Sequence, residues 1–325
     1  MKSILFAAML ALTFAQASAA SFDCAKANTP SSKQICSEPE LSKLDDELAV
    51  VFSEARSKLS VESQKLLVEG QRSWLRFHSR LCFFDDEARP KDKKASVQCQ
   101  IDEYRSRIGE LKQAGGMVFG VKSFPYFQGW VEVNSKGKYV SYERRALVLF
   151  DGTSPIPFAL NAIIQEWTKP VLFDSGGKSR GNEGVYWNTS VNVADVNSDI
   201  AIIKVFAEGY TGGAHPESDS VVLYYSKMLN MPIRLSDVFK SPEWKLQAEK
   251  VARQHFKTKG IEVINYDIFA KPDDNFGYLI NSEGFLIDGF LSHAERAADG
   301  VTMRWKDFSK YLTPLGIKLS QVKIR

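Results

Sequence analysis

The stretch SVQCQIDEYRSRIGELK, residues 96–112, carries the clearest helical pattern in the chain. Its apolar residues recur every three to four positions, at Val97, Ile101, Tyr104, Ile108 and Leu111. This spacing places them on one face of a helix. We therefore predict a helix here, and Gly115-Gly116 behind it is expected to end the helical part of the chain.

Two more helices are predicted before it. Ser37, Pro39 and Glu40 have the arrangement of a helix start, with a cap, a first-turn proline and a glutamate three residues after the serine. Ser60 is a second candidate cap. The apolar faces that follow these starts are Leu41, Leu44, Leu48, Val51, Phe52, Ala55 and Leu59, and then Leu67, Trp74, Phe77 and Leu81. Residues 21–114 are thus predicted to form a three-helix domain with Trp74 in its core.

The first twenty residues are typical of a secretory signal peptide. Lys2 precedes an apolar run over residues 4–16, and small residues occupy positions 17–20. Cleavage after Ala19 or Ala20 would start the mature chain near Ser21. We expect a periplasmic or secreted protein. A lipid anchor is not expected, because Cys24 does not directly follow the cleavage site.

Export places the four cysteines in an oxidising compartment, where an even number favours disulfides over metal ligands. Three pairings are possible. Sequence-adjacent pairing is favoured, because each bridge then closes a short loop worth on the order of 3 kcal/mol. The predicted disulfides are Cys24–Cys36, tying the incoming arm to the first helix, and Cys82–Cys99, joining the second helix to the third.

Several motifs follow one another in this segment: SFDCAKA at residues 21–27, IC at 35–36, PEL at 39–41, QRSWL at 71–75 and YRSRI at 104–108. In this order, with Cys82 and Cys99 between the last two, they resemble the LprI-like lysozyme-inhibitor N-terminal family. The resemblance implies a small, helical, secreted domain that acts on lysozyme. The chain departs from the founding type of the family, a lipoprotein, in lacking a lipobox.

After Gly116 the pattern changes to strands, predicted at residues 139–150, 185–193, 200–210 and 221–225. Helices are predicted at 157–167, at 242–256 with Ser241 as cap, and at 306–312. Strands and helices without regular alternation indicate an α+β fold with an antiparallel sheet. The expected organisation is a signal peptide over 1–20, a helical domain over 21–114 and an α+β domain over 117–325.

The loop YTGGAHP, residues 210–216, lies between two predicted strands, and LSDVF follows at 235–239. This arrangement resembles the RsiV-like domain over residues 120–315 or so. That domain occurs in anti-sigma factors that sense lysozyme and beside the catalytic domain of some peptidoglycan deacetylases. The chain departs from it at Ser292–Arg296, where members usually carry a Pro-Tyr-rich stretch.

Two interpretations of this loop stay open. In one, its glycines adopt positive φ, Pro216 stiffens the exit and His215 satisfies backbone groups. In the other, the loop protrudes and recognises a partner, since an imidazole or a backbone donor could enter the carboxylate-bearing cleft of a lysozyme. The candidate partner-binding residues are Tyr210, Gly212, Gly213 and His215.

No catalytic residue, metal or cofactor is predicted. The stretch DSGG at residues 174–177 looks like the serine region of a trypsin-type protease, but its flanking residues do not fit. The four histidines are scattered without metal-ligand spacing. The alternative is a cell-envelope enzyme, or an accessory module of one, that acts on peptidoglycan directly. It would be favoured by a deep cleft in the C-terminal domain where two or more titratable groups such as Asp195, Glu208 and His215 converge.

Charge and hydropathy limit the partners. The 42 basic and 39 acidic residues leave a net charge of +3, too little for a nucleic-acid-binding surface. No run of 18 apolar residues follows the N-terminus, so no membrane span is expected. The predicted function is that of a secreted, non-catalytic protein that binds and inhibits lysozyme or a related muramidase. Because animal lysozymes are strongly basic, binding should involve local acidic patches or shape complementarity.

Overall fold

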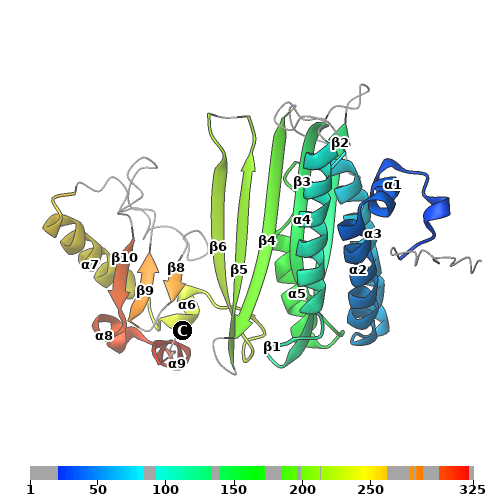
Figure 1. Cartoon of the computed structure of the whole chain (residues 1–325). Coiled ribbons are helices and arrows are strands. Elements are labelled where there is room, and N and C mark those ends of the chain that lie inside the picture. The colour runs from blue at the N-terminus through cyan, green and yellow to red at the C-terminus, as the bar shows by residue number, and fades with distance from the viewer. Residues whose placement is uncertain are drawn as a thin grey trace, which may run out of the picture.

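The computed structural model describes residues 21–83, 93–133, 139–172, 184–195, 199–212, 214–261, 278–280, 283–287 and 300–321. Residues 1–20, Gly213, the DSGG stretch and Ser292–Arg296 lie outside this description. The described residues form an α+β protein in which helices flank a mixed sheet (Figure 1).

The N-terminal segment is helical, as predicted, but a further short α-helix precedes the three helices that the sequence predicted. After a short 3-10 helix at Cys24–Lys26 come α1 (Pro30–Ser37), α2 (Pro39–Ser57), α3 (Val61–Leu81) and α4 (Lys93–Lys112). Ser60 caps α3 by accepting a hydrogen bond from the backbone nitrogen of Ser63. The predicted cap at Ser37 is wrong, because Ser37 is the last residue of α1 and Glu38 takes the cap position of α2 without a side-chain bond.

Two disulfides join the cysteine pairs that the spacing favours. Cys24 is bonded to Cys36, which ties the incoming arm to α1. Cys82, at the C-terminus of α3, is bonded to Cys99 inside α4. Both bridges therefore lie within the helical segment, and the second holds α3 and α4 together across the connection between them.

The central sheet has seven strands in sequence order, β1 to β7. Their bounds are Met117–Val118, Val121–Val133, Tyr139–Phe150, Val185–Asp195, Ile200–Tyr210, Glu217–Ser226 and Met231–Pro232. The sheet is antiparallel except for β3 and β4, which pair in parallel. A parallel pair needs a crossover, and α5 (Pro155–Trp167) lies in that connection.

The helices and the sheet share one hydrophobic core. Phe77 of α3 packs edge-on against Phe127 of β2, with ring centroids 5.3 Å apart. Gly129 allows this close approach, since a Cβ atom there would lie 2.5 Å from the ring of Phe77. Its backbone nitrogen also donates to Ser73 Oγ at 3.0 Å. The division at residue 117 stays a prediction, because this core spans both sides of it.

The C-terminal residues form a second core beyond β6 and β7 (Figure 1). They comprise α6 (Leu235–Val238), α7 (Trp244–Thr258), a small sheet of β8 (Tyr278–Ile280), β9 (Gly284–Ile287) and β10 (Val301–Arg304), then α8 (Trp305–Phe308) and α9 (Pro314–Ser320). Ser241 is not the cap of α7, because Glu243 occupies that position. This core includes Ile202 of β5 and Tyr224 of β6, so it packs on one end of the central sheet.

Candidate functional site

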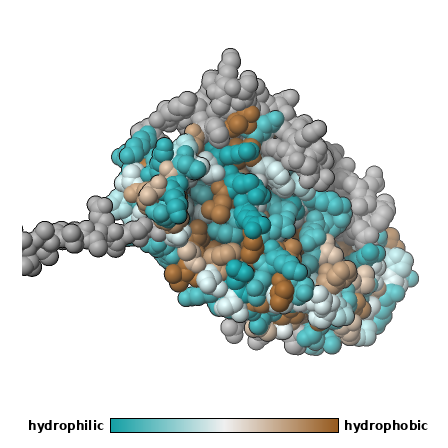
Figure 2. Space-filling model, turned by 90° about the vertical axis from the view of Figure 1, so that its right-hand side faces the viewer, coloured by the Kyte–Doolittle hydropathy of each residue, from teal (hydrophilic) through white to brown (hydrophobic). Residues whose placement is uncertain are grey.

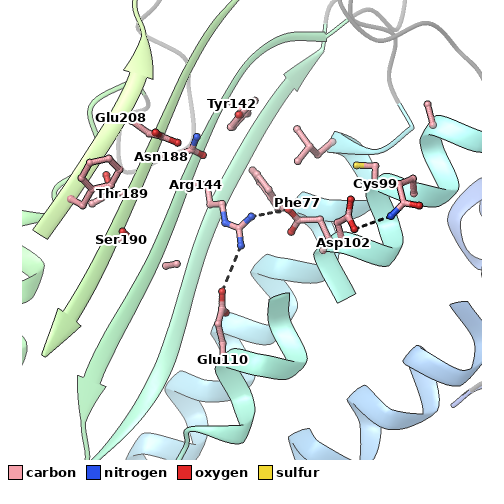
Figure 3. A pocket seen from close by; sticks show the side chains of 16 residues that line it. Phe77, Cys99, Asp102, Glu110, Tyr142, Arg144, Asn188, Thr189, Ser190 and Glu208 are labelled. Atoms are coloured by element: carbon pink, nitrogen blue, oxygen red, sulfur yellow. Dashed lines mark hydrogen bonds and ion pairs between the residues drawn. The ribbon is translucent and has the colours of Figure 1, made fainter. Parts of the chain in front are cut away.

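A groove of about 820 Å³ lies between α4 and one face of the central sheet. We call it the α4–sheet groove. Figure 3 shows its two walls, with α4 on one side and strands β3 to β5 on the other. Its lining residues are Phe77, Leu81, Ala95, Gln98, Cys99, Asp102, Glu103, Glu110, Tyr142, Arg144, Ala146, Asn188, Thr189, Ser190, Phe206 and Glu208.

The alternation of side chains along the strands produces this groove. In β3, Tyr142 and Arg144 point toward the groove, whereas Glu143 turns to the opposite face and accepts hydrogen bonds from the backbone of residues 171 and 172. On the neighbouring strands Asn188 pairs with Glu208, and Ser190 pairs with Phe206. The helices cover β2 and the adjoining side of β3, so this part of β4 and β5 stays open.

Arg144 holds the inner side of the groove together. Its guanidinium lies 2.7 Å from Glu103 and 3.5 Å from Glu110, both on α4 (Figure 3). The second oxygen of Glu103, Oε2, is buried with no hydrogen-bond partner among the described residues. Burial raises the pKa of Glu103, while the charge of Arg144 lowers it. The guanidinium of Arg144 therefore compensates the charge of the buried Glu103 carboxylate.

Arg107 extends this network into the protein interior. Its side chain is fully buried and lies 2.8 Å from Glu110, and its Nε donates to Gln71 of α3 at 2.9 Å. Burial lowers the pKa of the Arg107 guanidinium, and Glu110 opposes that shift. Two arginines and two glutamates thus balance one another between the helices and the sheet.

Two further carboxylates remain outside that balanced network. Asp102 of α4 accepts a hydrogen bond from Gln98 at 2.9 Å. The side chain of Glu208 on β5 has no hydrogen-bond or ion-pair partner within the described part of the chain. Both side chains are exposed and line opposite walls (Figure 3). Phe206 is 44 % exposed beside them. The open part of the groove therefore combines negative charge with aromatic surface.

The predicted recognition loop lies at one end of this face. Tyr210 is the last residue of β5, two positions after Glu208, so both side chains point to the same side of the strand. Gly212 has φ +100°, as the structural interpretation of the loop requires. His215 is exposed, with Nδ1 3.0 Å from the carbonyl oxygen of Pro216. Gly213 is outside the described residues.

The three groups of the enzymatic alternative do not converge. Asn188 is the partner of Glu208, and Asp195 lies seven residues further along β4, which corresponds to roughly 23 Å. There Asp195 Oδ1 accepts a hydrogen bond from the backbone nitrogen of Phe119. His215 is in the loop beyond the other end of the strand. Asp195 therefore does not converge with Glu208 and His215, and these three residues do not favour the enzymatic alternative.

No group of three or more His, Cys, Asp or Glu residues among those described could hold a metal ion. None of the helices found in the described ranges is long and apolar enough to cross a membrane.

The outer face of the helical segment has a mixed surface. Figure 2 views the molecule from that side, and hydrophobic residues there are scattered among hydrophilic ones. Trp74 is fully buried, as predicted, and so is not part of this surface.

Sequence reasoning missed the groove and the network around Arg144. Two signals were present. Glu143-Arg144-Arg145 places three charged residues in a row within a strand, and Glu103 and Arg107 stand one helical turn apart beside the apolar face of α4. Neither signal tells which strand faces which helix, because β2 itself was not predicted.

The protein is thus an α+β protein with a disulfide-bonded helical segment packed on a mixed sheet. Residues 24–111 match the family model described as Lysozyme inhibitor LprI. No curated protein matches the chain. The resemblance of the second segment to the RsiV-like domain stays a prediction.

Two solved structures show limited similarity. One is a DUF3298 family protein from Pseudomonas aeruginosa PAO1, with 13 % identity and a TM-score of 0.44, covering 63 % of this chain and 98 % of that one. The other is a DUF3298 family member from Bacteroides fragilis NCTC 9343, with 10 % identity and a TM-score of 0.43, covering 62 % and 96 %. TM-scores below 0.5 do not establish a shared fold.

Proposed function

We propose that this protein binds and inhibits lysozyme or a related muramidase outside the cytoplasm. The observation that carries the proposal is the match of residues 24–111 to the Lysozyme inhibitor LprI family model. This range includes both disulfides and α1 to α4 up to Leu111. Disulfides are typical of oxidising compartments, which fits a protein that meets a muramidase in the periplasm or after secretion.

The proposal predicts that the purified mature protein slows lysis of peptidoglycan by lysozyme. The measurement is the turbidity of a cell-wall suspension, with lysozymes of several types and micromolar protein. The same protein with its disulfides reduced and alkylated is the control, since loss of both bridges removes on the order of 6 kcal/mol of support from the helical segment. Unchanged lysis with every lysozyme type would refute the function.

The loop supplies a second, residue-level prediction. If His215 enters a partner, His215→Ala should weaken inhibition by about 1–3 kcal/mol of binding. The Tm of the His215→Ala variant should hardly differ from that of the wild type, because the side chain of His215 is exposed. A variant that loses stability but inhibits normally per folded molecule would show that the loop is structural.

A further inference from the structure

We propose that the α4–sheet groove is the docking surface for a basic segment of the partner polypeptide, with an arginine as the main contact. This proposal rests on the proposed function, since it locates the surface that would hold the muramidase. Charge favours a cationic partner. The described lining has four carboxyl groups, Asp102, Glu103, Glu110 and Glu208, and one cation, Arg144.

Two of these four carboxylates remain available to a partner. Arg144 is bonded to Glu103 and Glu110, and Glu110 is also bonded to Arg107, so their charges are already compensated. Asp102 and Glu208 are not compensated by any described cation, and they stand on opposite walls (Figure 3). A cationic side chain between these walls would gain charge-assisted hydrogen bonds from both.

Aromatic surface in the groove favours arginine as the cation. Phe206 and Tyr142 belong to the sheet wall of the groove, and Phe206 is 44 % exposed. A guanidinium stacks on an aromatic ring while its edges donate to carboxylates. Arg144 itself shows this geometry, because its guanidinium carbon lies 5.6 Å from the ring centre of Phe127.

The net charge of the chain cannot attract a basic enzyme. That charge is +3, so long-range forces do not draw a basic enzyme toward the chain, and the favourable contact has to be local. The groove supplies such a local contact, since it places the carboxylates of Asp102 and Glu208 beside the exposed ring of Phe206.

The test uses the double variant Asp102→Asn with Glu208→Gln, in which both exposed carboxylates become neutral isosteres. Asp219→Asn is the matched control, because Asp219 is exposed on the same hairpin but pairs with Ala207 and points to the other face. With a basic lysozyme, the double variant should bind at least about tenfold more weakly than the wild type, and the control should bind normally. Equal binding by all three proteins would overturn the groove while leaving the function intact.

A second arm tests the groove without lysozyme. Octa-arginine is titrated into the wild type, the double variant and the control at low and high salt. Weaker binding by the double variant alone, with the difference shrinking at high salt, supports the groove. Equal affinity of all three proteins for octa-arginine overturns the groove as the docking surface. It is also overturned if the wild type binds chitotriose instead of octa-arginine and the double variant does not bind chitotriose. Failure of the wild type to bind any lysozyme then refutes the proposed function separately.

The geometry points to a second inference at the start of the chain: the α-amino group released at Ser21 is the ion-pair partner of the buried Asp45. Asp45 is 6 % exposed. Its Oδ2 accepts hydrogen bonds from the backbone nitrogen and hydroxyl of Ser21, at 2.8 and 2.6 Å, and its Oδ1 accepts from Tyr104. No lysine or arginine of the described ranges forms an ion pair with it.

A buried carboxylate with only neutral donors is costly, and a cation removes much of that cost. Signal-peptide cleavage after Ala20 turns the nitrogen of Ser21 from an amide into an ammonium at the position that Asp45 already contacts. Processing would thus complete the packing of the N-terminal arm on α2. This inference favours Ala20 over Ala19 as the last residue removed.

The test compares the chain that starts at Ser21 with one that keeps Ala19-Ala20, each with Asp45 and with Asp45→Asn. The chain that starts at Ser21 should have the higher Tm, by at least about 2 °C, and the difference should vanish in the Asp45→Asn background. Equal Tm values for the two Asp45 chains would overturn the inference. So would an exported protein whose measured mass places its first residue elsewhere than Ser21.

Discussion

Replacing Trp74 by alanine is expected to lower the free energy of unfolding by about 3–5 kcal/mol, the range for removing a large buried aromatic side chain. Trp74 has no exposed surface. It stacks on His78 at 4.2 Å between ring centres and meets Tyr104 edge-on at 5.1 Å. The substitution leaves a cavity between α3 and α4 that backbone relaxation cannot close while the Cys82–Cys99 bridge holds the two helices.

The matched control is Leu75→Ala, one residue further along α3. Leu75 is 43 % exposed, so its truncation should change stability by no more than about 0.5 kcal/mol. Urea unfolding followed by far-ultraviolet circular dichroism measures both variants without depending on the missing tryptophan. A loss below about 1 kcal/mol for Trp74→Ala would show that the helical core is not organised around this side chain.

Local patterns in the sequence predict several of the longer elements, but not the short strands β1 and β7 to β10 or the helices α1, α6 and α9. The strands at 139–150 and 200–210 have the predicted bounds, since charged or turn-forming residues flank their apolar runs. The helices α3 and α4 follow from their apolar spacing, and the disulfides follow from the short loops they close. Each of these features depends on residues close together in the chain.

Features that depend on distant residues were not predicted. Strand β2 (Val121–Val133) contains Pro125 and Gly129, which weaken a strand pattern, yet it is the strand on which α3 packs. The parallel pairing of β3 and β4 was missed for a similar reason, because the α5 connection looks the same in sequence whichever way the strands pair. The α4–sheet groove arises from both features, so local patterns could not locate it.

Acid is expected to destabilise the protein through His78, which is the second large effect. His78 is 2 % exposed on α3. Burial lowers its pKa to about 4, although the carbonyl of Trp74 and the charge of Asp45 act to raise it. Nε2 has no hydrogen-bond partner in the described chain. The folded protein therefore keeps His78 neutral, whereas the unfolded chain protonates it below its ordinary pKa of 6.5.

The sign follows from this difference. The unfolded state binds the extra proton first as the pH falls, so stability is full above pH 6.5 and declines between 6.5 and about 4. The loss is on the order of 3 kcal/mol. His78→Phe preserves the stacking on Trp74 but cannot be protonated, so its free energy of unfolding should decline less over the same interval. Urea unfolding of the wild type and of His78→Phe at pH 7 and pH 4.5 measures how much stability each protein loses. The effect of all titratable groups common to both proteins cancels when the two losses are subtracted. Parallel declines in the two proteins would mean that His78 is protonated equally in the folded and unfolded states.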